Sequence, residues 1–189
     1  MDPVHKISIV QRGFGALGYT MQLPTEDRYL QTRGDLLSQL SVLLGGRTAE
    51  EIALGEISTG AQNDLQRATD IARAMVTEWG MSDAVGAIHF DSAKRSRFLD
   101  IAMPAERGAY AEDTARLIDA EVKRIMSDAH ADARRILSDQ REMLEAVTRR
   151  LLAQEVMEGR ELREMMGVPE PAISQAGETV PLPTETPVI

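Results

Sequence analysis

The hydrophobic residues near the start of the chain follow the pattern of short strands. Segment 4–10 is rich in β-branched residues, and segment 17–23 is a second short run that Pro24 ends. Between them lies Gly13-Phe14-Gly15, which is typical of a turn. The pattern predicts two strands joined by a glycine-rich turn. A two-stranded ribbon is only marginally stable in water, so we expect it to pack on helices.

From Thr32 the hydrophobic period becomes helical. A leucine stripe runs to Gly45-Gly46, resumes after these glycines and ends at Gly55. The glycines predict either a break in the helix or a close approach of another helix. Ser58-Thr59-Gly60 leads into a second predicted helix, which runs to Trp79 and is ended by Gly80. The predicted stripes comprise Leu36, Leu37, Leu40, Leu43, Leu44, Ala49, Ile52 and Ala53 in the first helix and Leu65, Ala68, Ile71, Ala72, Met75, Val76 and Trp79 in the second.

Segment 81–108 has no sustained period and predicts a long loop with a short strand at 87–90. Two longer helices are expected over 113–152, with Ser138-Asp139 as the N-cap of the second, and a short helix over 160–166. Residues 167–189 contain five of the eight prolines and no apolar period, which predicts a disordered tail. The sequence therefore predicts a mainly α fold with a small N-terminal β-ribbon.

Composition narrows the functional classes. The net charge of −9 argues against a nucleic-acid partner, and the absence of cysteine excludes disulfides and thiolate chemistry. No apolar run approaches the ~20 residues that span a bilayer.

The glycines at 13, 15 and 18 match G-x-G-x-x-G, the fingerprint of dinucleotide sites. Such a site needs a helix that opens at the third glycine, whereas Tyr19 and the residues after it have the character of a strand. We therefore favour a turn that leads into an edge strand. Such an edge can bind an extended peptide by strand addition.

The acidic and imidazole side chains leave more than one interpretation open. His5, His89 and His130 are far apart and lack H-x-x-x-H spacing, which indicates structural or exposed histidines. Asp64 falls at the rim of the buried stripe of its helix. It is either a first-turn capping residue or an inward carboxylate compensated by a helix N-terminus, by hydrogen bonds or by a cation. Glu50-Glu51 is either a solvated face or an acidic pair near a site.

Several motifs together resemble the peptidase domain of FtsH, the membrane-anchored AAA protease family. The resemblance covers residues 2–166 in order. The stretches that carry it are Asp2-Pro3-Val4-His5-Lys6, Arg12-Gly13, Ala16-Leu17-Gly18-Tyr19-Thr20, Gly45-Gly46-Arg47-Thr48-Ala49-Glu50-Glu51, Ser58-Thr59-Gly60-Ala61-Gln62-Asn63-Asp64-Leu65, Trp79-Gly80-Met81-Ser82 and Ile118-Asp119-Ala120-Glu121-Val122.

The resemblance implies a zinc endopeptidase. In the family, two histidines of an H-E-x-x-H helix and the Asp of the T-G-A-x-N-D motif bind zinc, so the match makes Asp64 the third ligand. The family's general base is the Glu between the two histidines. The resemblance also implies that the strand region Gly15, Ala16, Leu17, Gly18 and Tyr19 is the edge along which an unfolded substrate lies.

The chain departs from the family pattern in one important respect: it contains no H-E-x-x-H and no ATPase loop. We expect residues 1–166 to be an FtsH-type peptidase domain without its zinc-binding helix, and this chain alone to be inactive. The alternative is a catalytically dead relative or an assembly module.

The family further implies a hexameric parent that uses zinc and ATP and degrades unfolded or membrane proteins. Membrane helices absent from this chain would anchor that parent in the bacterial inner membrane, with this domain in the cytoplasm.

Overall fold

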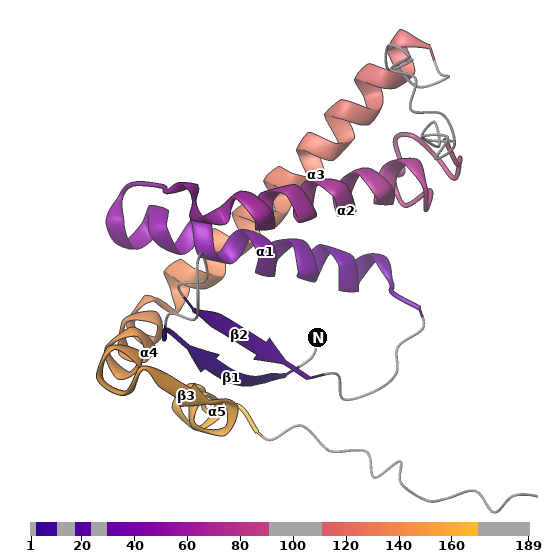
Figure 1. Cartoon of the computed structure of the whole chain (residues 1–189). Helices are drawn as coiled ribbons and strands as arrows, with labels where there is room; N and C mark the ends of the chain where they lie inside the picture. Colours follow the sequence, from indigo (N-terminus) through magenta and orange to yellow (C-terminus); the bar gives the residue numbers. More distant parts are fainter. Residues whose placement is uncertain (1–2, 11–17, 24–29, 91–110, 170–189) are drawn as a thin grey trace, which may run out of the picture. The chain divides into compact units, whose positions relative to one another are not determined.

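The computed structural model describes residues 3–10, 18–23, 30–90 and 111–169. The chain divides into two compact units, each of which is treated by itself. One unit is Tyr29–Glu145 and the other combines Asp2–Arg28 with Ala146–Ile189. Figure 1 labels their helices and strands.

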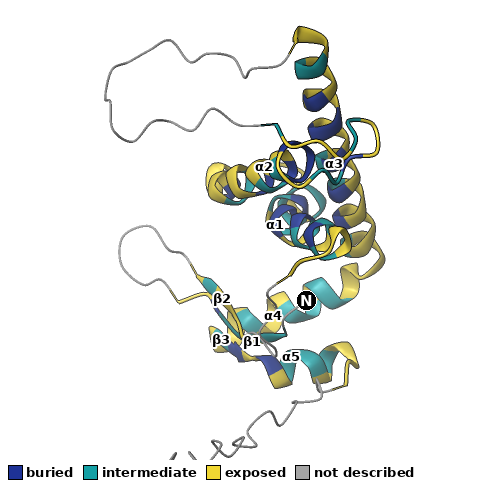
Figure 2. Ribbon diagram, turned by 90° about the vertical axis from the view of Figure 1, so that its right-hand side faces the viewer, coloured by how far each residue is buried: buried dark blue, intermediate teal, exposed yellow. Residues whose placement is uncertain are grey.

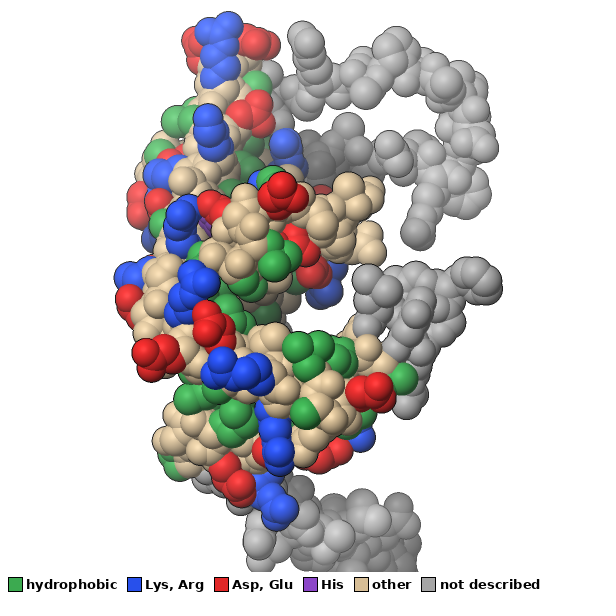
Figure 3. Space-filling model, turned by 90° about the vertical axis from the view of Figure 1, so that its left-hand side faces the viewer, with side chains coloured by type: hydrophobic (Ala, Val, Ile, Leu, Met, Phe, Trp, Pro, Cys, Tyr) green, Lys and Arg blue, Asp and Glu red, His purple; other side chains and the backbone are tan. Residues whose placement is uncertain are grey.

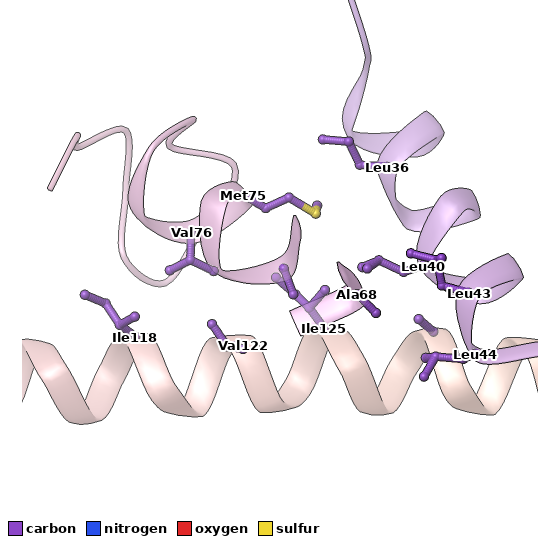
Figure 4. Packing of buried hydrophobic residues seen from close by; sticks show 12 residues of the cluster. Leu36, Leu40, Leu43, Leu44, Ala68, Met75, Val76, Ile118, Val122 and Ile125 are labelled. Carbon is purple, nitrogen blue, oxygen red and sulfur yellow. The ribbon is translucent and has the colours of Figure 1, made fainter. Parts of the chain in front are cut away.

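The first unit is built around three helices, α1 (Arg33–Leu54), α2 (Gln62–Thr77) and α3 (Glu112–Asp139). Each packs on the other two, and their apolar stripes meet in one core (Figure 2, dark blue). Figure 4 shows side chains of the three helices pointing toward one another. The core cluster comprises Leu36, Leu40, Leu43, Leu44, Ala68, Ala72, Met75, Val76, Ile118, Val122, Ile125 and Ala129. The predicted mainly helical fold is confirmed.

Local sequence signals set both ends of α1. The Thr32 hydroxyl accepts from the backbone N–H of Asp35, and the Asp35 carboxylate accepts from the N–H of Thr32 at 3.0 Å, which together form a capping box. Gly55 ends the helix with φ 74°, a left-handed conformation that favours glycine. The helix continues through Gly45 and Gly46, so of the two alternatives, a break or a close approach of another helix, the break is excluded. A Cβ added at either glycine would meet nothing within 4 Å among the described residues.

Three details of the first unit correct the sequence predictions. Trp79 follows α2 and is 47% exposed, so it does not continue the buried stripe. Residues 87–90 form no strand; instead the N–H of Phe90 donates to the carbonyl of Thr77 at 2.8 Å. Ser138 and Asp139 belong to the last turn of α3 and do not cap α4 (Arg141–Gln154), whose first backbone bond goes to the carbonyl of Gln140.

The second unit contains a three-stranded antiparallel sheet in the order β2-β1-β3. Strands β1 (Val4–Ser8) and β2 (Tyr19–Gln22) are the predicted ribbon, and β3 (Val156–Glu158) is a strand that the hydrophobic pattern did not predict. Helix α5 (Gly159–Met166) follows β3 directly and packs on β1 and β3. The ribbon is therefore widened by a strand from the far end of the chain.

Gly159 explains why β3 and α5 can join so closely to β1. A Cβ at this position would collide with the backbone carbonyl of Val4. Only glycine permits this approach of the two backbones.

The surface carries both signs of charge. On the face drawn in Figure 3, basic and acidic side chains are interspersed. None of the helices in the described part of the chain combines the length and the hydrophobicity needed to cross a membrane.

Candidate metal ligand and substrate edge

Asp64 is the third residue of α2 and lies in its first turn. It is partly buried, next to Leu65 and Ala68, which pack into the three-helix core. The free backbone N–H groups of a helix N-terminus favour a negative charge at this position. The structure therefore places the Asp64 carboxylate at the rim of the core, as the helical period predicted.

The Asp64 carboxylate makes no polar contact within the described residues. Ala61, which precedes the helix, has no capping side chain, and Asp64 takes part in none of the hydrogen bonds or ion pairs found there. The geometry gives no support to a capping role for Asp64. Its oxygens are available to a ligand from outside the described residues.

The described residues do not complete a metal site. Among them, no three His, Cys, Asp or Glu side chains are grouped so that they could hold a metal ion. A catalytic zinc ion takes three protein ligands and keeps a fourth position for water. Asp64 can supply one of these ligands, and the described part of this chain does not by itself fit zinc.

The three histidines have separate surroundings. His89 contacts the carbonyl of Glu78 through Nδ1 at 3.0 Å, and Nε2 of His130 lies 3.2 Å from Oε2 of Glu51. His5 lies on β1 and is exposed. These contacts agree with the structural or exposed roles predicted from their spacing.

Glu50 and Glu51 do not form a paired acidic site, because each has its own partners. Glu51 joins α1 to α3: its Oε1 accepts from Arg134 at 2.6 Å, and its Oε2 faces His130. Glu50 binds Ser58: its Oε2 accepts from the Ser58 backbone N–H and its Oε1 from the Ser58 hydroxyl, both at 2.8 Å. These backbone and side-chain hydrogen bonds hold the pKa of Glu50 below its usual range.

A second polar cluster anchors the segment after α2 to α3. Glu121 is buried on α3, and its Oε2 accepts from the hydroxyl of buried Ser82 at 2.8 Å. Arg124 donates to both Glu121 oxygens at 2.9 Å. The hydrogen bonds from Arg124 lower the pKa of Glu121 from 4.5 to about 2. Burial of the carboxylate opposes this shift, and the hydrogen bond from Ser82 adds to it. A buried carboxylate is thus kept charged by a full set of donors.

The predicted substrate edge is only partly described. Gly15, Ala16 and Leu17 lie outside the described residues, whereas Gly18 and Tyr19 lead into β2. In the described sheet β2 has a neighbour on one side only, β1. A Cβ at Gly18 would come within 2.5 Å of the Ser8 carbonyl, so this glycine allows the chain to approach β1 closely. Tyr19–Gln22 is a strand and not a helix, which argues against the dinucleotide interpretation.

Comparison with known proteins identifies the family. The model of peptidase family M41 matches residues 1–165, most of the chain. The chain belongs to peptidase family M41. The M41 chain is 52% identical over 164 residues to an ATP-dependent zinc metalloprotease FtsH of Syntrophobacter fumaroxidans, an alignment that covers 87% of this chain and 25% of that protein.

Two further relatives carry similar names. ATP-dependent zinc metalloprotease FtsH 4 of Synechocystis sp. is 49% identical over 164 residues (87% of this chain, 26% of that protein). ATP-dependent zinc metalloprotease FtsH of Ralstonia pickettii is 49% identical over 162 residues (85% and 23%). The M41 chain thus spans about a quarter of the length of these relatives, and the FtsH resemblance drawn from the motifs is confirmed.

Two polar contacts were missed by sequence reasoning. The Glu50–Ser58 and Ser82–Glu121 pairs each join two of the motifs by which the family resemblance was recognised. The motifs marked these residues, but a period along one helix carries no information about a partner on another element.

Proposed function

We propose that this chain is the proteolytic domain of an ATP-dependent zinc metalloendopeptidase that degrades unfolded or membrane proteins. The observation that supports it most is Asp64, a first-turn carboxylate at the rim of the core with no polar contact among the described residues. Asp64 would be one of three zinc ligands, and the other two would be the histidines of an H-E-x-x-H segment. A zinc ion held there would polarise the substrate carbonyl and acidify a bound water.

The H-E-x-x-H segment is not among these 189 residues, and its Glu would be the general base. The zinc site is therefore complete only when such a segment joins Asp64. It follows from the proposal that this chain alone does not hydrolyse protein or hold zinc tightly.

The substrate would bind along the edge formed by Gly15, Ala16, Leu17, Gly18 and Tyr19. An edge strand offers unpaired backbone N–H and C=O groups, which bind an extended chain with little dependence on its side chains. Such recognition suits a protease that acts on unfolded polypeptides.

The assembly and location of the whole protein belong to the same proposal. The relatives are named ATP-dependent FtsH proteases and are about four times as long as the match. We infer a membrane-anchored homo-hexamer with this domain in the cytoplasm and ATP bound by a separate module.

Replacement of Asp64 tests the proposal in the full-length protein. Asp64→Asn should reduce casein proteolysis by more than about 100-fold, because loss of a ligand costs more than loss of its supporting contacts, and should leave ATP hydrolysis unchanged. Asp70→Asn, an exposed position on the same helix, is the matched control. Unchanged proteolysis in Asp64→Asn would refute the assignment.

The isolated 189-residue chain gives a second test. After dialysis against a chelator it should retain no stoichiometric zinc and should not cleave casein. Retained zinc with cleavage would contradict the proposal. Sedimentation of the chain separates an assembly module from a monomeric fragment, since a stable ring without peptidase activity would favour the former.

A further inference from the structure

Met21 is an exposed apolar side chain on an outer strand of the sheet in the second unit. It lies on β2, which pairs with β1 and has no second neighbour among the described strands (Figure 1). The side chain of Met21 is 41% exposed. Side chains two residues apart on a strand share a face, so Tyr19 and Met21 lie on the same side of β2.

The register of the sheet places Met21 on the face opposite to its buried row of side chains. Ile7 is paired with Met157, which is 1% exposed, so their row forms the buried side. Met21 belongs to the next row, in which its partner on β1 is Lys6. The Lys6 ammonium binds the Glu158 carboxylate of β3 at 2.9 Å. The row of Met21 is therefore polar on β1 and β3, and burial within this unit does not account for an apolar residue at position 21.

We propose that Met21 is a specificity-determining residue of the substrate edge and that it favours extended substrates with apolar side chains at alternate positions. The inference rests on the proposed function, in which an unfolded chain binds along the edge that reaches Tyr19. This edge continues from Tyr19 through Met21, because Tyr19–Gln22 is one uninterrupted strand.

The alternation of side chains along a strand determines which substrate residues meet Met21. A chain that adds beside β2 directs successive side chains to opposite faces, and directly opposite Cβ atoms lie about 5 Å apart. One substrate side chain thus contacts Met21, and the side chain two positions along contacts Tyr19. The substrate residue between them lies on the face of Thr20, which is polar and exposed. Methionine suits varied apolar partners, because its side chain is flexible and its sulfur is polarizable.

Peptide binding to the 189-residue chain is the first measurement. The probes are two blocked hexapeptides of equal charge: one carries two phenylalanines separated by a threonine, and the other carries glutamine in place of each phenylalanine. Titrations followed through the backbone amide resonances of β2 should show that the phenylalanine peptide binds at least about fivefold more tightly, as expected for two cross-strand apolar pairs. Met21→Thr, which keeps a residue that favours strands, should reduce this ratio about threefold.

Two further variants separate the side chain of Met21 from general effects on the strand. Met21→Leu should retain the wild-type ratio, and an equal loss in Met21→Leu and Met21→Thr would contradict a role of the apolar side chain. Met166→Thr is the matched control, because Met166 is 50% exposed and lies on α5, outside the edge strand. Equal binding of the two peptides by the wild type, or a ratio that Met21→Thr leaves unchanged, would overturn the inference. If neither peptide shifts the β2 resonances, the substrate edge itself is wrong, and the inference falls with it.

Cleavage of the same peptides by the full-length protein is the second measurement. Met21→Thr should lower kcat/KM for the phenylalanine peptide about threefold and leave kcat/KM for the glutamine peptide unchanged. An equal decrease for both peptides would contradict a role in specificity. Asp64→Asn should abolish cleavage of both peptides. If it does not, the proposed metal ligand is wrong, while peptide binding by the 189-residue chain still decides the role of Met21.

Discussion

Replacing Glu121 by glutamine removes the negative charge at the link between α3 and the segment after α2. Glutamine keeps the volume and can still accept from Ser82, but it loses the charge-assisted bonds from Arg124. The wild-type contacts lower the pKa of Glu121 from 4.5 to about 2. Since one pKa unit equals about 1.4 kcal/mol, the upper limit of this stabilisation is about 3.5 kcal/mol.

Solvent reduces this limit. The side chain of Arg124 is 47% exposed, and water screens an exposed partner strongly. We therefore expect Glu121→Gln to lower the free energy of unfolding by about 2 kcal/mol at neutral pH.

The pH dependence has a definite sign. Because the folded-state pKa of Glu121 is lowered, its contribution is fully present above pH 4.5 and is lost as the pH falls toward about 2. The difference in unfolding free energy between wild type and Glu121→Gln should therefore be constant above pH 4.5 and shrink below it.

Urea denaturation followed by far-UV circular dichroism at neutral pH and at several lower pH values measures this difference. Glu112→Gln is the matched control, since Glu112 lies on the same helix in an exposed ion pair with Arg116 at 3.7 Å. It should cost less than about 0.5 kcal/mol. A Glu121→Gln variant as stable as this control, or a difference that grows on acidification, would refute the reasoning.

Three other substitutions have defined outcomes. Thr32→Ala removes the capping box of α1 and should cost about 1 kcal/mol in urea denaturation, and an unchanged midpoint would show that the cap is not used. Met75→Ala empties a fully buried site and should cost about 2–5 kcal/mol, whereas Met166→Ala at a half-exposed position should cost under about 0.5 kcal/mol. Gly159→Ala should accelerate amide exchange in β1, because the added Cβ collides with that strand. In Gly45→Ala the added Cβ meets nothing within 4 Å, so this substitution should raise the free energy of unfolding by up to about 1 kcal/mol. Unchanged β1 exchange in Gly159→Ala would contradict the close backbone contact.

The features that the sequence determined by itself are those that depend on neighbours along the chain. The helical period predicted α1, α2 and the long α3–α4 region, because side chains three and four residues apart share one face. Thr32 and Gly55 marked the ends of α1, since capping uses residues adjacent to the helix. The motif around Asp64 indicated the family through residues that are consecutive in the sequence, and the family match agrees with it.

Only the tertiary structure decided the contacts between distant segments. Strand β3 is three residues long and pairs with β1 from the other end of the chain, so no local period could reveal it. Trp79 continues the period of α2 but lies beyond its end, where exposure depends on which elements pack nearby. The Glu50–Ser58 and Ser82–Glu121 bonds join residues on separate elements. Such bonds form only when the chain folds back on itself, and the packing of the helices in three dimensions decides which segments then meet.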